Sequence, residues 1–181
     1  MAQSPTIYNF DIELSHVDRA VYETLSLRVA CQPSETPEFL LTRVLAYCLE
    51  YQEGISFGKG FTEPGEPALA VHDLTGAMQV WIDIGSPDAA RLHKASLTIP
   101  RVVVYSHKEP RILLASLAGQ RIHKAGELEI YSLDRELLES LASRLDRRTR
   151  LTISVTDGHL YVTLGDETWD GPVERLQLTA S

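Results

Sequence analysis

The feature that most constrains the fold is a strand-to-helix junction near the middle of the chain. Residues 77–84 alternate between apolar and polar side chains, which predicts a strand with two different faces. One face carries Met78, Val80, Ile82 and Ile84, and the other carries Gln79, Trp81 and Asp83. Ser86, Pro87 and Asp88 then favour a helix N-terminus. The apolar run 101–106 favours a buried parallel strand, so the junction predicts a parallel β–α–β unit.

A pair of acids is predicted to meet in the hairpin that precedes this helix. Residues 67–72 read as the first strand of the hairpin, and the Asp-Leu-Thr-Gly sequence at 73–76 is typical of a turn. We expect the first and last residues of this turn to be paired. In that register Glu66 lies opposite Asp83, and directly opposed side chains have Cβ atoms about 5 Å apart. Two like charges so close favour a divalent cation between them, although a one-residue bulge would send the acids to opposite faces.

The remaining periodicity predicts one domain over residues 1–181 with a mixed α/β fold. Residues 5–31 read as an antiparallel hairpin. Residues 34–107 read as a core in the order helix, strand, strand, strand, helix, strand. Residues 108–181 read as a C-terminal extension of helices and strands. We expect a single mixed sheet with helices packed on it and antiparallel hairpins added to it.

The first helix of this core is predicted to be central and buried. It begins near Thr36 and ends before Gly54, and its apolar positions cover a wide arc. Arg43 lies among these apolar positions. A buried guanidinium needs an acidic partner, and Glu50, on roughly the same side of the helix, is the predicted one.

The composition limits the classes of function. The chain is 44% hydrophobic and 23% charged, which is typical of an ordinary globular protein. Its formal net charge of −8 argues against a protein whose main task is to coat nucleic acid. Its two cysteines, Cys31 and Cys48, have no metal-ligand spacing and fit a reducing compartment. Because the sequence shows no signal peptide and no membrane-spanning run, we expect a cytoplasmic protein without a membrane partner.

The candidates for chemistry are acids with lysines near them, since the common catalytic signatures are absent from the sequence. Glu66 and Asp83 could hold a metal ion with Lys59 or Lys94 beside it. A metal bound in this way activates water and stabilises a phosphate transition state. The structural alternative is a charged rim in which the two lysines neutralise the two acids. The helix that follows Asp83 also carries the cations Arg91, His93 and Lys94.

Several motifs resemble those of the YaeQ family of bacterial proteins, whose biochemical function is not established. They are PSETPEFLLTR (33–43), FGKG (57–60), GEPAL (65–69), DLTG (73–76), WIDIGSPD (81–88), RLHKA (91–95) and VVVY (102–105). The resemblance covers nearly the whole chain. It implies a variation on the PD-(D/E)xK nuclease fold, with a restriction-endonuclease-like αβββαβ core to which antiparallel β-hairpins are added.

The resemblance also implies where a nuclease site would lie. One motif acid stands at the start of the second core strand, where Glu66 precedes Pro67 instead of following a proline. The second acid is Asp83, but Gly85 stands where the motif has lysine. The resemblance therefore implies Mg²⁺ held by Glu66, Asp83 and a helix acid, with a relocated lysine. The helix acid would be Glu35 or Glu38, and the lysine would be Lys59 or Lys94, with Lys59 better placed to reach the site.

Two functions follow from these observations. The first is a Mg²⁺-dependent phosphodiesterase or nuclease that acts on nucleic acid. The second is a catalytically inactive nuclease-fold protein that binds a nucleic acid, a protein or a small molecule. The retained acids and lysines favour the first function, whereas Gly85 and the acidic net charge favour the second. Together these observations favour the nuclease-like site slightly over the inactive binding module.

Overall fold

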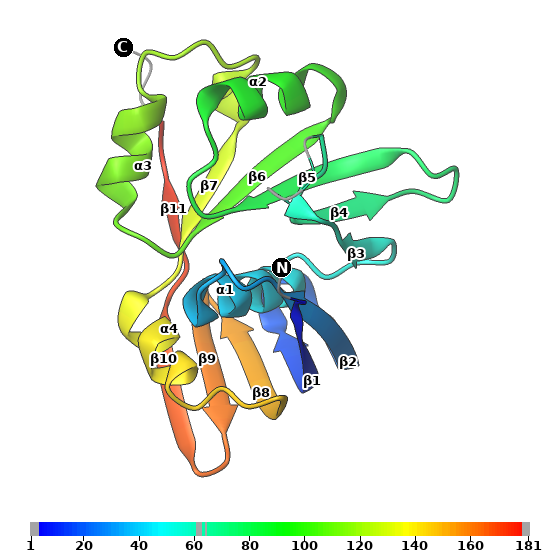
Figure 1. Ribbon diagram of the computed structural model, residues 1–181, viewed down its shortest axis with the longest axis vertical. Coiled ribbons are helices and arrows are strands. Elements are labelled where there is room, and N and C mark those ends of the chain that lie inside the picture. The colour runs from blue at the N-terminus through cyan, green and yellow to red at the C-terminus, as the bar shows by residue number, and fades with distance from the viewer. Residues whose placement is uncertain (1–3, 61–62, 64, 179–181) are drawn as a thin grey trace. The chain divides into compact units, whose positions relative to one another are not determined.

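The computed structural model describes residues 4–60, 63 and 65–178, and it divides into two compact units (Figure 1). The first unit comprises residues 1–49 and 133–173, and the second comprises residues 50–132 and 174–181. Each unit has its own mixed β-sheet, so the expectation of one sheet is wrong. The fold is mixed α+β, with four α-helices in the described part of the chain.

The first unit is built on a five-stranded sheet with the order β10-β9-β8-β1-β2. Its strands are β1 (Thr6–His16), β2 (Val21–Cys31), β8 (Arg148–Thr156), β9 (His159–Leu164) and β10 (Glu167–Pro172). The β1–β2 pair is an antiparallel hairpin, as predicted, and the β8–β9 pair is a second antiparallel hairpin. Strand β10 was not predicted, and β1 pairs in parallel with β8. This parallel pair ties the two ends of the chain into one sheet.

Two helices pack in the first unit, α1 (Pro37–Leu49) and α4 (Arg135–Ala142). They contact each other, and α4 contacts β10 (Figure 1). Helix α1 is buried on almost every side, as its wide apolar arc predicted. Arg43 is buried too, but its partners are the Glu35 carboxylate at 3.0 Å and the Ala30 carbonyl at 2.7 Å. The predicted partner Glu50 is wrong because Glu50 follows the last residue of α1 and belongs to the second unit.

The second unit is built on a six-stranded sheet with the order β11-β7-β6-β5-β4-β3. Its strands are β3 (Ile55–Phe57), β4 (Leu69–His72), β5 (Met78–Ile84), β6 (Arg101–Ser106), β7 (Glu129–Ser132) and β11 (Glu174–Leu176). Strands β5 and β6 are parallel, with Val80 opposite Arg101 and Asp83 opposite Val104. Helix α2 (Ala89–Thr98) connects them, so the predicted β–α–β unit is confirmed.

Helices α2 and α3 (Pro110–Leu117) pack on the same face of this sheet (Figure 1). The side chains that they bury form one core with the sheet, namely Trp81, Leu92, Ala95, Val102, Val104, Leu113, Leu117, Ile122, Leu128 and Ile130. Helix α2 begins slightly later than predicted. Its N-cap is Asp88, whose side chain accepts a hydrogen bond from the Arg91 amide at 2.8 Å, so Ser86 lies before the cap.

The register of the β4–β5 hairpin differs from the predicted one. The Asp73 amide bonds the carbonyl of Ala77 at 2.9 Å, which makes the turn one residue longer than expected. A bulge at Gln79 follows, so that Val71 faces Val80 and Leu69 faces Ile82. Two shifts of one residue therefore separate the acids, and Glu66 lies before β4 rather than opposite Asp83.

The bulge also changes the face on which one side chain lies. Met78 was predicted beside Val80, but it packs against the core that contains Trp81. The extra residue in the bulged strand reverses the alternation between Met78 and the rest of β5. The face toward α2 therefore gains a long, flexible apolar side chain at the start of the strand.

A half-buried ionic network lies in the second unit around Arg101 on β6. Its guanidinium bonds the Glu50 carboxylate at 2.6 and 3.2 Å and the Glu129 carboxylate at 2.6 and 3.0 Å. Tyr105 donates to Glu50 at 2.6 Å, and Tyr131 donates to Glu129 at 2.7 Å. Burial alone would raise the pKa of Glu129, but the hydrogen bond and charge of Arg101 hold that pKa below its ordinary value. Burial, with Glu129 beside it, raises the pKa of Tyr131 to about 12, so this phenol remains a donor at neutral pH.

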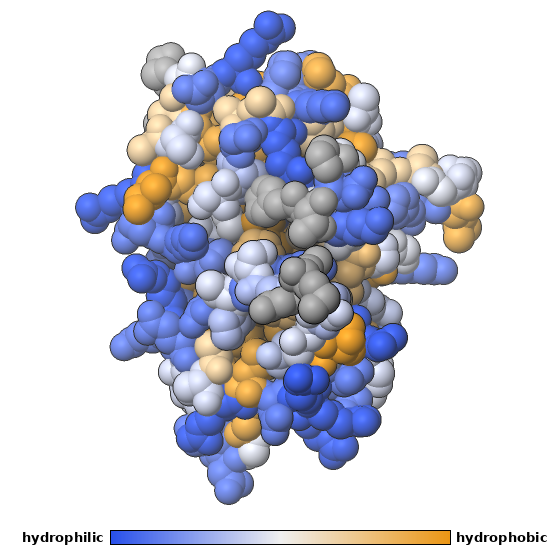
Figure 2. All heavy atoms as spheres, in the orientation of Figure 1, coloured by the Kyte–Doolittle hydropathy of each residue, from blue (hydrophilic) through white to orange (hydrophobic). Residues whose placement is uncertain are grey.

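The run from α1 to β6 has the predicted order of helix, strand, strand, strand, helix, strand. Its first helix belongs to the first unit, and its strands and second helix belong to the second. The assignment of this run to a restriction-endonuclease-like core remains a prediction, as do the predicted domain limits. In the view of Figure 2, hydrophilic residues cover most of the surface and hydrophobic atoms are scattered in small groups. No helix among the described residues is long and apolar enough to cross a membrane.

Candidate functional site

The centre of the candidate site is an ion pair between Asp83 and Arg91 in the second unit. Asp83 lies near the end of β5 with a side chain that is 1% exposed, and Arg91 lies in the first turn of α2. Arg91 Nε bonds Asp83 Oδ2 at 2.9 Å, and Arg91 Nη2 bonds Asp83 Oδ1 at 3.0 Å. Both carboxylate oxygens are thus engaged by one planar guanidinium, which is the strongest geometry for this kind of pair.

Three further contacts fix the position of Arg91. Its Nη2 also donates to the main-chain carbonyl of Glu66, and its own amide donates to the N-cap carboxylate of Asp88. Its guanidinium lies 5.0 Å from the centre of the Trp81 ring, within the range of a cation–π contact. The arginine is therefore held by a carboxylate, a carbonyl and an aromatic face, all from elements of the same unit.

Glu66 and Lys59 also meet, but through the main chain of the lysine. Glu66 Oε2 accepts a hydrogen bond from the Lys59 amide at 3.1 Å, while the Lys59 side chain is exposed. The structure therefore brings Glu66, Asp83 and Lys59 to one region of the second unit, where Arg91 bonds the Asp83 carboxylate and the main-chain carbonyl of Glu66. The sequence had instead predicted a metal ion or a lysine ammonium between the two acids.

The donor set of this region can be compared with the needs of Mg²⁺, which prefers several oxygen ligands in octahedral geometry. Both Asp83 oxygens are bonded to Arg91, and one Glu66 oxygen is bonded to the Lys59 amide. Within residues 4–60, 63 and 65–178, no three His, Cys, Asp or Glu side chains are grouped so that they could hold a metal ion. With the side chains in these positions, the residues do not fit a divalent cation, and metal binding remains a prediction.

The backbone conformation at Gly85 disfavours any residue with a side chain. Its φ is +91°, in the left-handed region that side chains rarely adopt, and its amide donates to the Tyr105 carbonyl at 2.8 Å. This conformation turns the chain sharply from β5 toward α2. A lysine at this position, where the predicted nuclease motif would have one, would strain the backbone.

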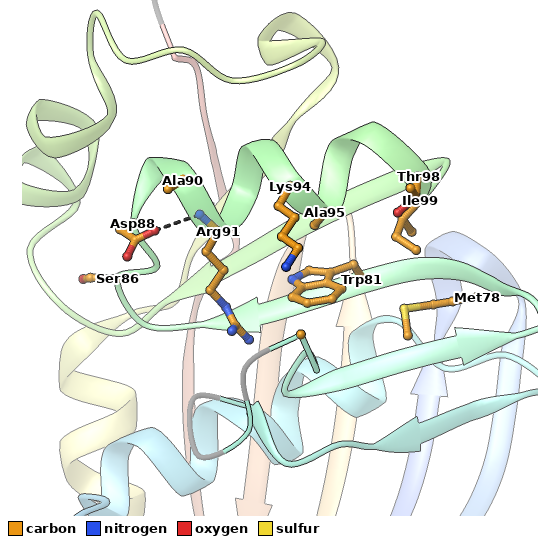
Figure 3. Close-up of a pocket in the computed structure, with 11 residues that line it drawn as sticks. Met78, Trp81, Ser86, Asp88, Ala90, Arg91, Lys94, Ala95, Thr98 and Ile99 are labelled. Carbon is orange, nitrogen blue, oxygen red and sulfur yellow. Dashed lines mark hydrogen bonds between the residues drawn. The ribbon is translucent and has the colours of Figure 1, made fainter.

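A hollow of about 760 Å³ opens beside the ion pair, between α2 and β5 (Figure 3). Its lining includes Met78, Trp81, Asp88, Arg91, Lys94 and Ile99. Figure 3 shows Arg91 and Lys94 extending from α2 toward the Trp81 ring, with Met78 and Ile99 at one end and Ser86 and Asp88 at the other. The hollow therefore has a polar end, a cationic middle and an apolar end.

Trp81 carries an unusual polar atom in the wall of this hollow. The residue is only 6% exposed, and among the described residues its indole Nε1 has no hydrogen-bond partner. Figure 3 shows this nitrogen on the edge of the ring that faces Lys94 and Arg91. A buried N–H without an acceptor is costly, and such groups often mark a position that a ligand or water satisfies.

The helix acids lie in the first unit. Glu35 precedes α1 and forms the ion pair with Arg43, and its Oε1 accepts a hydrogen bond from the Gln32 amide at 3.3 Å. Glu38 lies in the first turn of α1 and is half-buried. The metal-binding role of Glu35 remains a prediction. In this structure its carboxylate forms an ion pair with the buried Arg43.

Sequence reasoning missed the roles of Arg91 and Trp81. Arg91 was noted only as one of several cations on α2, whereas Lys59 and Lys94 were considered as partners of the acids. Arg91 could have been predicted as the partner of Asp83. A planar guanidinium forms two parallel hydrogen bonds to a buried carboxylate, whereas a lysine ammonium offers only a point charge. Trp81 and Asp83 were also correctly predicted to share a face of β5, which is the face that α2 covers.

The fold and this site define a mixed α+β protein in which a largely buried ion pair between Asp83 and Arg91 borders an open hollow. The chain belongs to the YaeQ family, because the family model described as YaeQ protein matches residues 1–171. An uncharacterized YaeQ protein of Escherichia coli (strain K12) is 26% identical over 164 residues, which are 90% of this chain and 91% of that protein. Its counterpart in Salmonella typhi is also 26% identical over 164 residues.

Solved structures share the fold. A crystal structure of a YaeQ protein from Pseudomonas syringae is similar with a TM-score of 0.85 and 29% identity, covering 99% of both chains. A YaeQ protein from Xanthomonas axonopodis pv. citri is similar with a TM-score of 0.78 and 26% identity, covering 98% of this chain and 100% of that one. Membership of the family predicted from the sequence motifs is therefore confirmed.

Proposed function

We propose that this chain is a non-catalytic binding protein of the YaeQ family, with its ligand site in the hollow between α2 and β5. The observation that supports this proposal is the two-point pairing of Asp83 with Arg91 at 2.9 and 3.0 Å. A metal ion bound by Asp83 would lie beside the positive guanidinium that engages both of its oxygens, and the two cations would repel each other. Here the Arg91 guanidinium neutralises the Asp83 carboxylate, so this buried acid needs no metal ion for charge balance.

The hollow supports the binding half of the proposal. Its volume of about 760 Å³ is in the range of sites for small organic molecules, which are typically apolar cavities with a few polar groups. The polar groups converge on the middle of this hollow, where Lys94 and Arg91 approach Trp81 (Figure 3). A small molecule is therefore a better match for this site than a nucleic acid or protein partner.

A hydrolysis assay tests the non-catalytic part of this proposal. We expect purified protein to leave supercoiled plasmid and labelled single-stranded DNA and RNA intact in the presence of Mg²⁺ or Mn²⁺. The matched control is Glu66→Gln, purified in the same way, because cleavage that is equal in both samples comes from a contaminating nuclease. Cleavage by the wild type that Glu66→Gln abolishes would refute the proposal.

A metal-dependent phosphodiesterase is the second candidate, and the meeting of Glu66, Asp83 and Lys59 in one unit favours it. This function requires Arg91 to leave the Asp83 carboxylate so that Mg²⁺ can take its place. Lys59 or Lys94 would then assist the attacking water. Because removal of the arginine would break a buried ion pair, this candidate carries an energetic cost that the binding function avoids.

A further inference from the structure

We propose that the hollow between α2 and β5 binds a small organic anion that carries one charged group on an apolar body. This inference rests on the proposed function and specifies the chemical class of its ligand. The hollow has a volume of about 760 Å³ and lies wholly within the second unit. Its two halves differ in polarity, which matches a molecule with one charged group and one apolar end.

The charged group would lie near Lys94. None of the ion pairs in the described part of the chain involves this lysine, and its side chain extends from α2 over Trp81 (Figure 3). The charge of its neighbour Arg91 is already balanced by Asp83. Lys94 therefore supplies an uncompensated positive charge in the middle of the hollow, where an anion would be attracted.

The second observation is the buried indole N–H of Trp81. Within the described residues this group has no acceptor, and it lies on the ring edge that faces Lys94 (Figure 3). An oxygen of a carboxylate, sulfonate or phosphate near Lys94 can accept from both the ammonium and the indole. A cation or a ligand with only donors would leave the N–H unsatisfied, so the donor pair selects an acceptor.

The apolar end explains why the ligand is more than an inorganic ion. Met78, Ile99 and Ala95 line the hollow beyond the Trp81 ring. Met78 reaches this face only because Gln79 forms the bulge in β5. Asp88, the one acid among the described lining residues, lies at the opposite end and caps α2 through the Arg91 amide. An anion near Lys94 can therefore extend an apolar body toward Met78 and away from Asp88.

Fluorescence titration can test this inference with a matched pair of probes. The chain has two tryptophans, so Trp169→Phe leaves Trp81 as the single reporter. In this background we would titrate 8-anilinonaphthalene-1-sulfonate and its uncharged analogue N-phenyl-1-naphthylamine. Energy transfer from Trp81 to the bound probe reports binding in the hollow. We expect the sulfonate to saturate at one site per chain and to bind about tenfold more tightly than the uncharged probe.

Lys94→Gln should weaken binding of the sulfonate about tenfold and leave the uncharged probe unaffected. Lys108→Gln is the matched control, because it removes an exposed lysine that does not line the hollow. Thermal melts should show that both variants remain folded. Equal affinities for the two probes, or equal effects of the two substitutions, would overturn the inference. These outcomes are separate from a failure of the proposed function, which metal-dependent cleavage by the protein would reveal.

Discussion

Asp83→Asn is expected to lower the free energy of unfolding by about 3–5 kcal/mol, as is typical when one partner of a buried ion pair is removed. The Asp83 side chain is 1% exposed and that of Arg91 is 14% exposed, so neither charge can be solvated in place of its partner. Asparagine has nearly the same volume and creates no cavity. Its amide can accept only one of the two guanidinium bonds and leaves the arginine charge unbalanced.

Urea denaturation followed by circular dichroism gives the size and sign of this change. The control is Asp88→Asn, which removes a nearby acid but keeps a good N-cap and should cost less than about 1 kcal/mol. Arg91→Met should be as damaging as Asp83→Asn, and the double variant should recover part of the loss through a favourable coupling energy. A gain of stability in Asp83→Asn would contradict this account, because it would mean that Asp83 and Glu66 repel each other without compensation.

Arg101→Met is expected to reduce the free energy of unfolding by about 3–5 kcal/mol. Arg101 is the common partner of Glu50 and Glu129, and the Glu50 side chain is 7% exposed. Without the guanidinium, two carboxylates lie close together, and the donors left to them among the described residues are the hydroxyls of Tyr105 and Tyr131. Methionine fills much of the arginine volume, so the loss measures the charge and hydrogen bonds rather than a cavity.

Two further variants separate these contributions in the same denaturation experiment. Arg101→Lys keeps the positive charge but removes the planar guanidinium. It should recover only part of the stability that Arg101→Met loses, because an ammonium cannot bond both carboxylates at two points each. Arg121→Met removes an exposed arginine of the second unit and should change stability by less than about 0.5 kcal/mol. If Arg101→Met is as harmless as Arg121→Met, the network does not contribute to the stability of the fold.

The β–α–β unit was predictable from sequence because its signals are local. The alternation in β5, the cap before α2 and the apolar run of β6 each lie within one window of the chain. The parallel pair of β1 and β8 was not predictable, because Asn9 lies opposite Arg148 and no local pattern links residues so distant. This long-range pair joins the N-terminal hairpin to β8, β9 and β10 in a sheet of their own, where a single sheet was expected.

The hairpin register shows the limit of turn rules. The Asp73 carboxylate accepts from the Thr75 amide at 2.9 Å and the Ala77 amide at 3.0 Å, which stabilises a longer turn than the sequence suggested. The bulge at Gln79 adds a second shift, and Gln79 Nε2 donates to Asp73 at 2.9 Å. Hydrogen bonds to the Asp73 side chain stabilise this register. The alternation of apolar and polar residues does not reveal these bonds.

Part of the site was predictable as well. Asp83 was placed at the end of a strand on the face of Trp81, and the helix that follows was expected to carry cations. Which of Arg91, Lys59 and Lys94 pairs with Asp83 depends on the direction in which each side chain leaves its element and on how deeply Asp83 is buried. The alternation of apolar and polar residues specifies neither. The hollow depends on Met78 and the bulge, so its shape could be derived only from the three-dimensional structure.

Isothermal titration of Mn²⁺ into the wild-type protein tests most directly whether Arg91 or a metal ion neutralises Asp83. The arginine is bonded to both Asp83 oxygens, so we predict only the heat of dilution and no saturable binding. Asp83→Asn, checked for folding by thermal melt, should give the same trace. Saturable binding of one Mn²⁺ per wild-type chain that Asp83→Asn abolishes would contradict this account and support the metal-dependent phosphodiesterase.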